Sequence, residues 1–225
     1  MNVQTPIRVL SIAVAFTSAV GLGILSVTAA SPHQRPPREI TPNGQPLADR
    51  VKPDDTDVTI SGRFSRPMKV HAPAGTSPVV WELNGMSALV VKLRPSASEL
   101  TEKGDWISTK WSGDITQVLR LAPGHPFSVG GTVQFVHQTG DIQIGKASVH
   151  ARYSWARDLK PGESYLMFVN WDVANSIAVV GPGTEYRILS DGSLEHVDTM
   201  PDEISKMTFQ QVSDEVRAWV RAHGG

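Results

Sequence analysis

The chain has 225 residues, of which 40% are hydrophobic and 19% are charged, a balance typical of a folded globular domain. Its 21 basic and 22 acidic residues leave a formal net charge of −1, which gives no indication of a nucleic-acid-binding surface. There is no cysteine, which excludes disulfides, thiol catalysis and cysteine-ligated metal centres.

The first thirty residues have the pattern of an export signal. Arg8 is followed by Val9–Ala30, an uncharged and mostly apolar run. A secretory signal has a positive start, an apolar centre and small residues before the cut, and Thr28-Ala29-Ala30 supplies the last of these. The run is also long enough for an uncleaved anchor, which needs about 20 apolar residues. We therefore expect residues 1–30 to be a signal peptide or an N-terminal membrane anchor. The protein is then exported, either periplasmic or secreted, and residues 9–30 tether it to the membrane if they are retained.

Residues 31–57 contain six prolines among charged and small side chains, with almost no large apolar residues. Such a segment buries too little surface to offset the entropy of ordering it, and repeated prolines hold it semi-extended. The sequence therefore predicts a Pro-rich disordered linker over residues 31–57 and a folded domain over residues 58–225.

The folded part is predicted to be mainly β. Its clearest strand is Ala147–Trp155, in which apolar residues alternate with polar ones such as His150. After a turn at Pro161-Gly162, Tyr165–Trp171 is a continuous apolar run, typical of a strand covered on both faces. We expect these two strands to form the centre of a β-barrel or sandwich. Further strands are predicted at residues 58–64, 79–83, 88–93, 106–111, 115–121, 129–136 and 177–180.

Two dipeptides predict hairpins, because Asn-Gly and Asp-Gly favour tight turns between strands. Asn84-Gly85 is expected to join residues 79–83 to residues 88–93. Asp191-Gly192 is expected to join residues 186–190 to residues 193–197, with Leu189 opposite Leu194 and Arg187 opposite His196.

The C-terminus changes to a helical period. Thr208 and Gln211 have the spacing of a capping box, and Phe209, Val212, Val216, Trp219 and Val220 fall on one stripe. We predict an amphipathic helix over residues 208–223, with Trp219 docked on the sheet. The predicted fold is a single antiparallel β-barrel, OB-like, or a β-sandwich, with this short helix at its end.

The sequence contains no nucleophile elbow, Walker loop, dinucleotide-binding turn or zincin motif. His125, His137 and His150 could meet at a metal only if the fold brought them together, because their spacing is not a ligand motif. We therefore predict no metal, no cofactor and no catalytic residue of recognisable type.

Recognition on a rigid scaffold commonly uses the loops at its ends. The loops that we expect to be used are Pro95–Asp105, Pro123–Ser128 and Asn170–Ser176. They would bring His125 and Trp171 to the rim of the barrel as partner-binding residues.

The order of the strands resembles a known family. The apolar strand Ala88–Leu93, the run from Asp114 to Gly124, the strand that begins at Gly130-Gly131 and the segment Leu159–Val169 follow one another as in netrin-like domains of the tissue-inhibitor-of-metalloproteinase type. Bacterial exported proteins of unknown function are similar in the same way. The resemblance covers residues 86–197 and implies an OB-fold barrel. The animal inhibitors use an N-terminal cysteine and disulfides, which this chain lacks, so no functional residue carries over.

Two functions are compatible with these features. The first is an exported, non-catalytic β-barrel domain that binds a protein or another cell-envelope component, with no nucleic-acid partner. The alternative is an extracytoplasmic hydrolase with a histidine or carboxylate base such as His137 or Glu163. A pocket lined by two or more ionisable side chains would favour the enzyme.

Overall fold

A computed structural model describes residues 36–62, 72–199 and 202–224. Of these, 44% are in strands and 15% in helices, so the predicted mainly β class is confirmed. The predicted signal peptide or anchor, and the last two residues of the predicted strand 58–64, lie outside the described residues.

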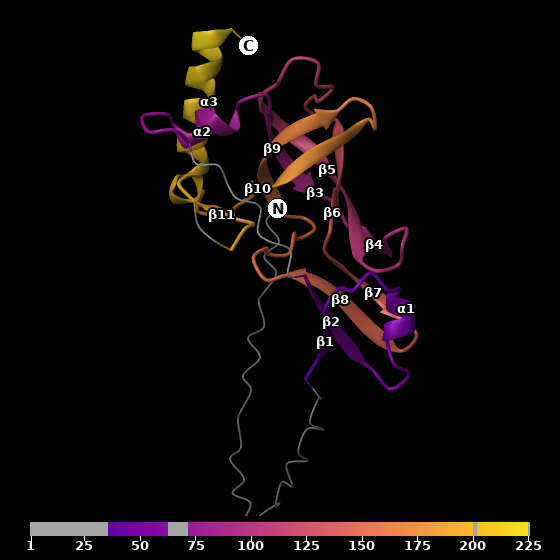
Figure 1. The fold of residues 1–225 in the computed structure, drawn as a ribbon. Helices are drawn as coiled ribbons and strands as arrows, with labels where there is room; N and C mark the ends of the chain where they lie inside the picture. The colour runs from indigo at the N-terminus through magenta and orange to yellow at the C-terminus, as the bar shows by residue number, and fades with distance from the viewer. Residues whose placement is uncertain (1–35, 63–71, 200–201, 225) are drawn as a thin grey trace, which may run out of the picture. The chain divides into compact units, whose positions relative to one another are not determined.

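The strands form two sheets, both visible in Figure 1. The smaller has the order β1-β2-β8-β7. Its strands are β1 (Arg38–Ile40), β2 (Asp57–Gly62), β8 (Ala147–Tyr153) and β7 (Gly140–Ile144). β1, β2 and β8 run parallel, and only β7 pairs antiparallel, with β8. In this sheet the predicted antiparallel pairing is therefore limited to β7 and β8.

The larger sheet has the order β11-β10-β9-β3-β5-β4, with β6 paired to β5, and it curls into a half-barrel (Figure 1). Its strands are β3 (Ser87–Leu93), β4 (Ala97–Leu100), β5 (Ile107–Arg120), β6 (Thr132–His137), β9 (Ser164–Asp172), β10 (Ile177–Ile188) and β11 (Leu194–His196). β6 also lies against β10, so the curl brings distant strands of the sheet together.

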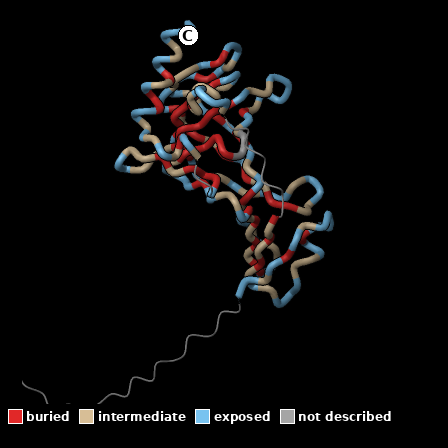
Figure 2. Tube along the Cα trace, turned by 60° about the vertical axis from the view of Figure 1, so that its left-hand side comes forward, coloured by how far each residue is buried: buried red, intermediate tan, exposed pale blue. Residues whose placement is uncertain are grey.

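Three clusters of buried side chains form the core, and Figure 2 shows the buried residues gathered inside the folded part and the exposed ones mainly along its outer loops. The barrel core lies on one face of the larger sheet and contains Leu89, Trp111, Phe135, Tyr165 and Met167. The helix-side core lies on the other face and contains Leu166, Phe168, Tyr186, Val212 and Val216. The small-sheet core contains Leu47, Ile60, Ile107, Val149 and Tyr153. As the sequence predicted, β9 is covered on both faces, because alternate residues enter the first two clusters.

The C-terminal helix forms as expected. α3 (Phe209–His223) begins with a complete capping box between Thr208 and Gln211, and Val212 and Val216 are buried. Trp219 packs against the helix-side core, and the guanidinium of Arg120 lies 4.3 Å from the centre of its ring. A cation over an aromatic face is attracted to the ring electrons, so this contact holds the last turns of α3 against β5.

The prediction of a disordered linker over residues 31–57 is wrong for its described part. This segment contains β1 and the short helix α1 (Leu47–Arg50), and Leu47 is completely buried. The amide of Leu47 donates to the carbonyl of Gly104 at 2.7 Å, and Arg38 pairs with Asp55 at 2.6 Å. The few apolar side chains of this segment are enough to order it, because they pack into the small-sheet core, to which other strands contribute most of the residues.

Two predicted neighbours are separated. Ala147–Trp155 and Tyr165–Trp171 were expected to form the centre of a β-barrel or sandwich; β8 belongs to the smaller sheet and β9 to the larger, so the two strands do not pair with each other. Alternation and apolarity describe which faces of a strand are buried, and they do not specify its partner.

The expected hairpin at Asn84-Gly85 is a helix followed by a strand. Residues 78–82 form α2 (Pro78–Glu82), because the hydroxyl of Ser77 accepts from the amides of Val79 and Val80 and Pro78 occupies the first turn. A serine cap followed by proline is a helix start, and it overrides the strand preference of two valines.

The hairpin at Asp191-Gly192 forms one residue out of the predicted register. Ile188 lies opposite Leu194 and Arg187 opposite Glu195, whereas Leu189 pairs with Ser193. Gly192 has φ +80°, so the loop is a three-residue turn that ends in a left-handed glycine, and not a two-residue turn.

Three smaller differences concern strand boundaries. Residues 97–100 of a predicted loop form β4, and β7 was not predicted. The two strands expected at residues 106–111 and 115–121 are one strand, β5, which passes Val91 at Gly113, where any Cβ would collide.

Candidate functional site

His125 and Trp171, the predicted partner-binding residues, lie at the same end of the half-barrel. The rings of His125 and Phe127 meet edge to face at 5.8 Å, and those of Phe127 and Trp171 do so at 5.6 Å. The ring of His125 is anchored by a 2.8 Å hydrogen bond between its Nδ1 and the hydroxyl of Ser87. The three rings therefore form a fixed row in which Phe127 is the buried middle member. The sequence singled out the two outer residues and missed Phe127.

Two of the three predicted loops meet at this end. Ser87 pairs with Val169 and Ala88 pairs with Arg120, so the loops that follow β9 and β5 are neighbours. Residues 95–105 follow the opposite end of β3, where Leu93 pairs with Gly113. The third predicted loop therefore does not join the other two.

Exposed apolar side chains that the sequence analysis did not single out lie in these two loops or directly beside them. Val173 is 77% exposed, Val129 is 66% exposed and Leu121 is 44% exposed. We use the name aromatic rim for His125, Phe127 and Trp171 together with these three residues. Exposed apolar side chains beside a fixed aromatic row are a common feature of protein interaction sites.

The histidine considered as a catalytic base lies inside the half-barrel. His137, on β6, points its Nε2 at the carboxyl of Glu185, on β10, at 3.9 Å, and its Nδ1 lies 2.8 Å from the hydroxyl of Thr139. Burial lowers the pKa of His137 to about 4. Burial also raises the pKa of Glu185 to about 8, an effect to which the nearby Asp198 contributes. Both groups are neutral at neutral pH, so their contact is not an ion pair.

An irregularity in β10 places Glu185 in this position. The register of β10 against β9 shifts between Val180 and Glu185, and Gly183 within that interval has φ +84°. A bulge re-aims the side chains that follow it. The sequence signal for this feature is Gly181-Pro182-Gly183, which directly follows the predicted strand at residues 177–180.

The three histidines considered for a metal are dispersed. His125 is in the loop after β5, His137 is on β6, and His150 is on β8 in the smaller sheet. His150 contacts two carboxylates, Asp141 at 2.6 Å and Asp57 at 3.4 Å, and Arg152 shares Asp141 at 2.5 Å. Within residues 36–62, 72–199 and 202–224, no group of three or more histidine or carboxylate side chains is arranged to hold a metal ion.

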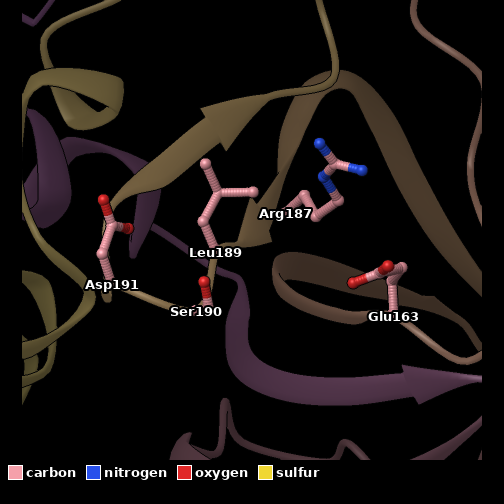
Figure 3. A pocket seen from close by; sticks show the side chains of 5 residues that line it. All are labelled: Glu163, Arg187, Leu189, Ser190 and Asp191. Carbon is pink, nitrogen blue, oxygen red and sulfur yellow. The ribbon is translucent and has the colours of Figure 1, made fainter. Parts of the chain in front are cut away.

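Glu163, the carboxylate considered as a base, lines a pocket of about 410 Å³ at the end of β10. The other lining residues are Arg187, Leu189, Ser190 and Asp191 (Figure 3). Glu163 comes from the turn before β9, whereas the other four follow one another along the end of β10 and its turn. His137 and Glu163 therefore do not share a site: His137 is buried on β6, whereas Glu163 is exposed and lines the pocket at the end of β10.

Comparisons with protein-family models, with curated proteins and with solved structures give no match for this chain. The part of the chain that the structure describes contains no helix both long and apolar enough to cross a membrane.

Proposed function

We propose that this protein is an exported, non-catalytic half-barrel domain that binds a protein partner of the cell envelope through the aromatic rim. The observation that carries the proposal is that the chain segments which supply the fixed row from His125 to Trp171 also carry Val129 and Val173, both largely exposed. Burying such side chains against a partner releases water from apolar surface, which stabilises a complex by roughly 25 cal/mol per Å² before the cost of association. Arg8 and the uncharged run after it support export.

The fixed positions of the rings also favour binding of a partner. Ser87 fixes His125, and Phe127 fixes Trp171, so little side-chain freedom is lost when a partner docks. Rigid aromatic residues at the centre of an interface contribute more affinity than mobile ones for this reason.

Photo-crosslinking in the producing cells tests the proposal. A photoreactive amino acid at position 173 or 129 is expected to give the same adduct, and Trp171→Ala is expected to abolish it. Position 100 is the control, because Leu100 is an exposed apolar residue on β4, outside the rim. An adduct formed equally from position 100, or one that survives Trp171→Ala, would contradict the proposal.

One observation favours the enzyme alternative: Glu163 shares its pocket with Arg187 and Asp191, so more than two ionisable groups are gathered there. The hydrogen bonds of these groups point to binding instead. Asp191 accepts from the amide and the hydroxyl of Ser193, at 2.9 and 2.6 Å, and Arg187 is paired with Glu195 at 2.7 Å. The hydroxyl of Ser193 and the carboxylate that it contacts are two residues apart, so this hydrogen bond stabilises the turn itself.

A further inference from the structure

The pocket at the end of β10 is lined by side chains of opposite charge (Figure 3). Its volume of about 410 Å³ is within the usual range for sites that hold a small molecule. It is separate from the aromatic rim: Tyr165 and Arg187 pair at this end of β9, whereas Trp171 and Ala178 pair toward the other.

Arg187 is the cationic member. Its Nη2 donates to Glu195 at 2.7 Å, and its Nε is buried without a hydrogen-bond partner. Glu195 is shared with a second cation, because Nη1 of Arg157 lies 3.5 Å from its other oxygen. Two guanidinium groups around one carboxylate leave a net positive charge on this side of the pocket.

Glu163 and Asp191 are the anionic members, and both are exposed. The hydrogen bonds from Ser193 lower the pKa of Asp191, so this carboxyl is charged at neutral pH. Tyr165 pairs with Arg187 across the two strands. Burial is the main cause that raises the pKa of its hydroxyl, which accepts from the amide of Lys160 at 2.9 Å; the charge of Arg187 lowers this pKa, and those of Glu163 and Glu195 raise it.

We propose that this pocket binds a small zwitterion, a molecule with an ammonium group a few bonds from an acid group. The guanidinium of Arg187 receives the acid, because its planar fork matches carboxylate and phosphate oxygens. Glu163 receives the ammonium group, and the side chain of Leu189 lies against the connecting carbons. A ligand with only one charge leaves one side of the pocket unpaired, which costs affinity.

The source of the zwitterion is either a free amino acid or an ethanolamine phosphate of the lipid-headgroup type, and two probes distinguish them. Isothermal titration calorimetry of the full chain with L-alanine and with O-phosphoethanolamine is expected to give, for one of them, a dissociation constant on the order of 0.1–1 mM. Acetate and ethylammonium, which each carry one of the two charges, are expected to bind at least about tenfold more weakly.

Glu163→Gln is the decisive variant, because Glu163 is exposed and its loss leaves the fold intact. It should weaken binding of the zwitterion about fivefold, the effect of one partly exposed ion pair. Glu99→Gln is its control, because Glu99 is also exposed and pairs with Lys110 on another strand. The proposal is overturned if neither zwitterion binds, if acetate or ethylammonium binds equally well, or if Glu99→Gln weakens binding as much as Glu163→Gln.

Discussion

At the scale of single residues, the most unusual feature is that β6 and β10 place a neutral acid and a neutral base against each other. Oε1 of Glu185 is buried without a hydrogen-bond partner, and Nε2 of His137 lies 3.9 Å away. A buried carboxyl keeps its proton because the charged form is costly without water. For the same reason a buried imidazole stays unprotonated. The pair therefore links the stability of the half-barrel to pH.

The sign of this linkage differs between the two groups. The folded state holds the proton of Glu185 up to about pH 8, whereas the unfolded state loses it near pH 4.5, so Glu185 makes stability fall as pH rises between these values. The unfolded state protonates His137 near pH 6.5 and the folded state only near pH 4, so His137 makes stability rise with pH from 4 to 6.5. The two effects oppose each other below pH 6.5, and only the loss remains above it.

We therefore expect the free energy of unfolding, measured with urea, to fall by up to about 2 kcal/mol between pH 6.5 and 8, at about 1.4 kcal/mol per unit. Glu185→Gln has nearly the same shape and no proton to lose, so it should abolish this fall. Glu102→Gln, an exposed carboxylate, should retain it. An equal fall in Glu185→Gln would show that this pair does not govern the pH dependence.

At the scale of the elements, the sequence predicted those whose signals are local. The capping box of α3 and the alternation in β8 each depend on residues that are close together in the sequence. The helix and the strand both form as predicted. The predictions failed where a distant contact decides the outcome. β1 exists because β2 is beside it, and the loop of residues 95–105 lies apart from the other two because of strand order. The rings of His125 and Trp171 are joined by Phe127, which has no local signal in the sequence.

The start of α2 provides a test at this scale. Ser77 caps the helix by accepting from the amides of Val79 and Val80 at 3.2 and 3.4 Å, and its hydroxyl also donates to Glu215 on α3. Ser77→Ala removes the cap and the link together. We expect it to lower the free energy of unfolding by about 1–2 kcal/mol, the usual cost of losing such a cap.

The control for this variant is Ser154→Ala, at an exposed turn, which should change stability by less than about 0.5 kcal/mol. Both are read from urea-unfolding midpoints and slopes. If the two variants behaved alike, the serine cap would not be what converts residues 78–82 from strand to helix.

At the scale of the whole described domain, the small-sheet core and the barrel core share one strand. Ile107, at the start of β5, belongs to the small-sheet core, whereas Trp111 and Ile115 of the same strand belong to the barrel core. The indole N–H of Trp106 also donates to the carbonyl of Gln138 at 2.8 Å, which links the start of β5 to the turn between β6 and β7. Disorder in the smaller sheet would therefore expose apolar surface at the base of the half-barrel, and we infer that the two sheets unfold as one cooperative unit.

This coupling makes the N-terminal boundary the sharpest test of the architecture. A chain that begins at Val58, where the sequence predicts the domain to start, lacks β1 and α1 and with them the buried side chains of Ile40 and Leu47. Each contributes about 2–3 kcal/mol by burial, so the loss is about 5 kcal/mol, comparable with the 5–15 kcal/mol total of a typical domain. We expect this chain to be largely unfolded in water, as measured by circular dichroism and urea titration, whereas a chain that begins at Pro36 should retain a cooperative transition. Equal unfolding midpoints for the two chains would mean that residues 36–57 are the linker that their composition suggests. A low midpoint for the Val58 chain alone would place the start of the domain at β1.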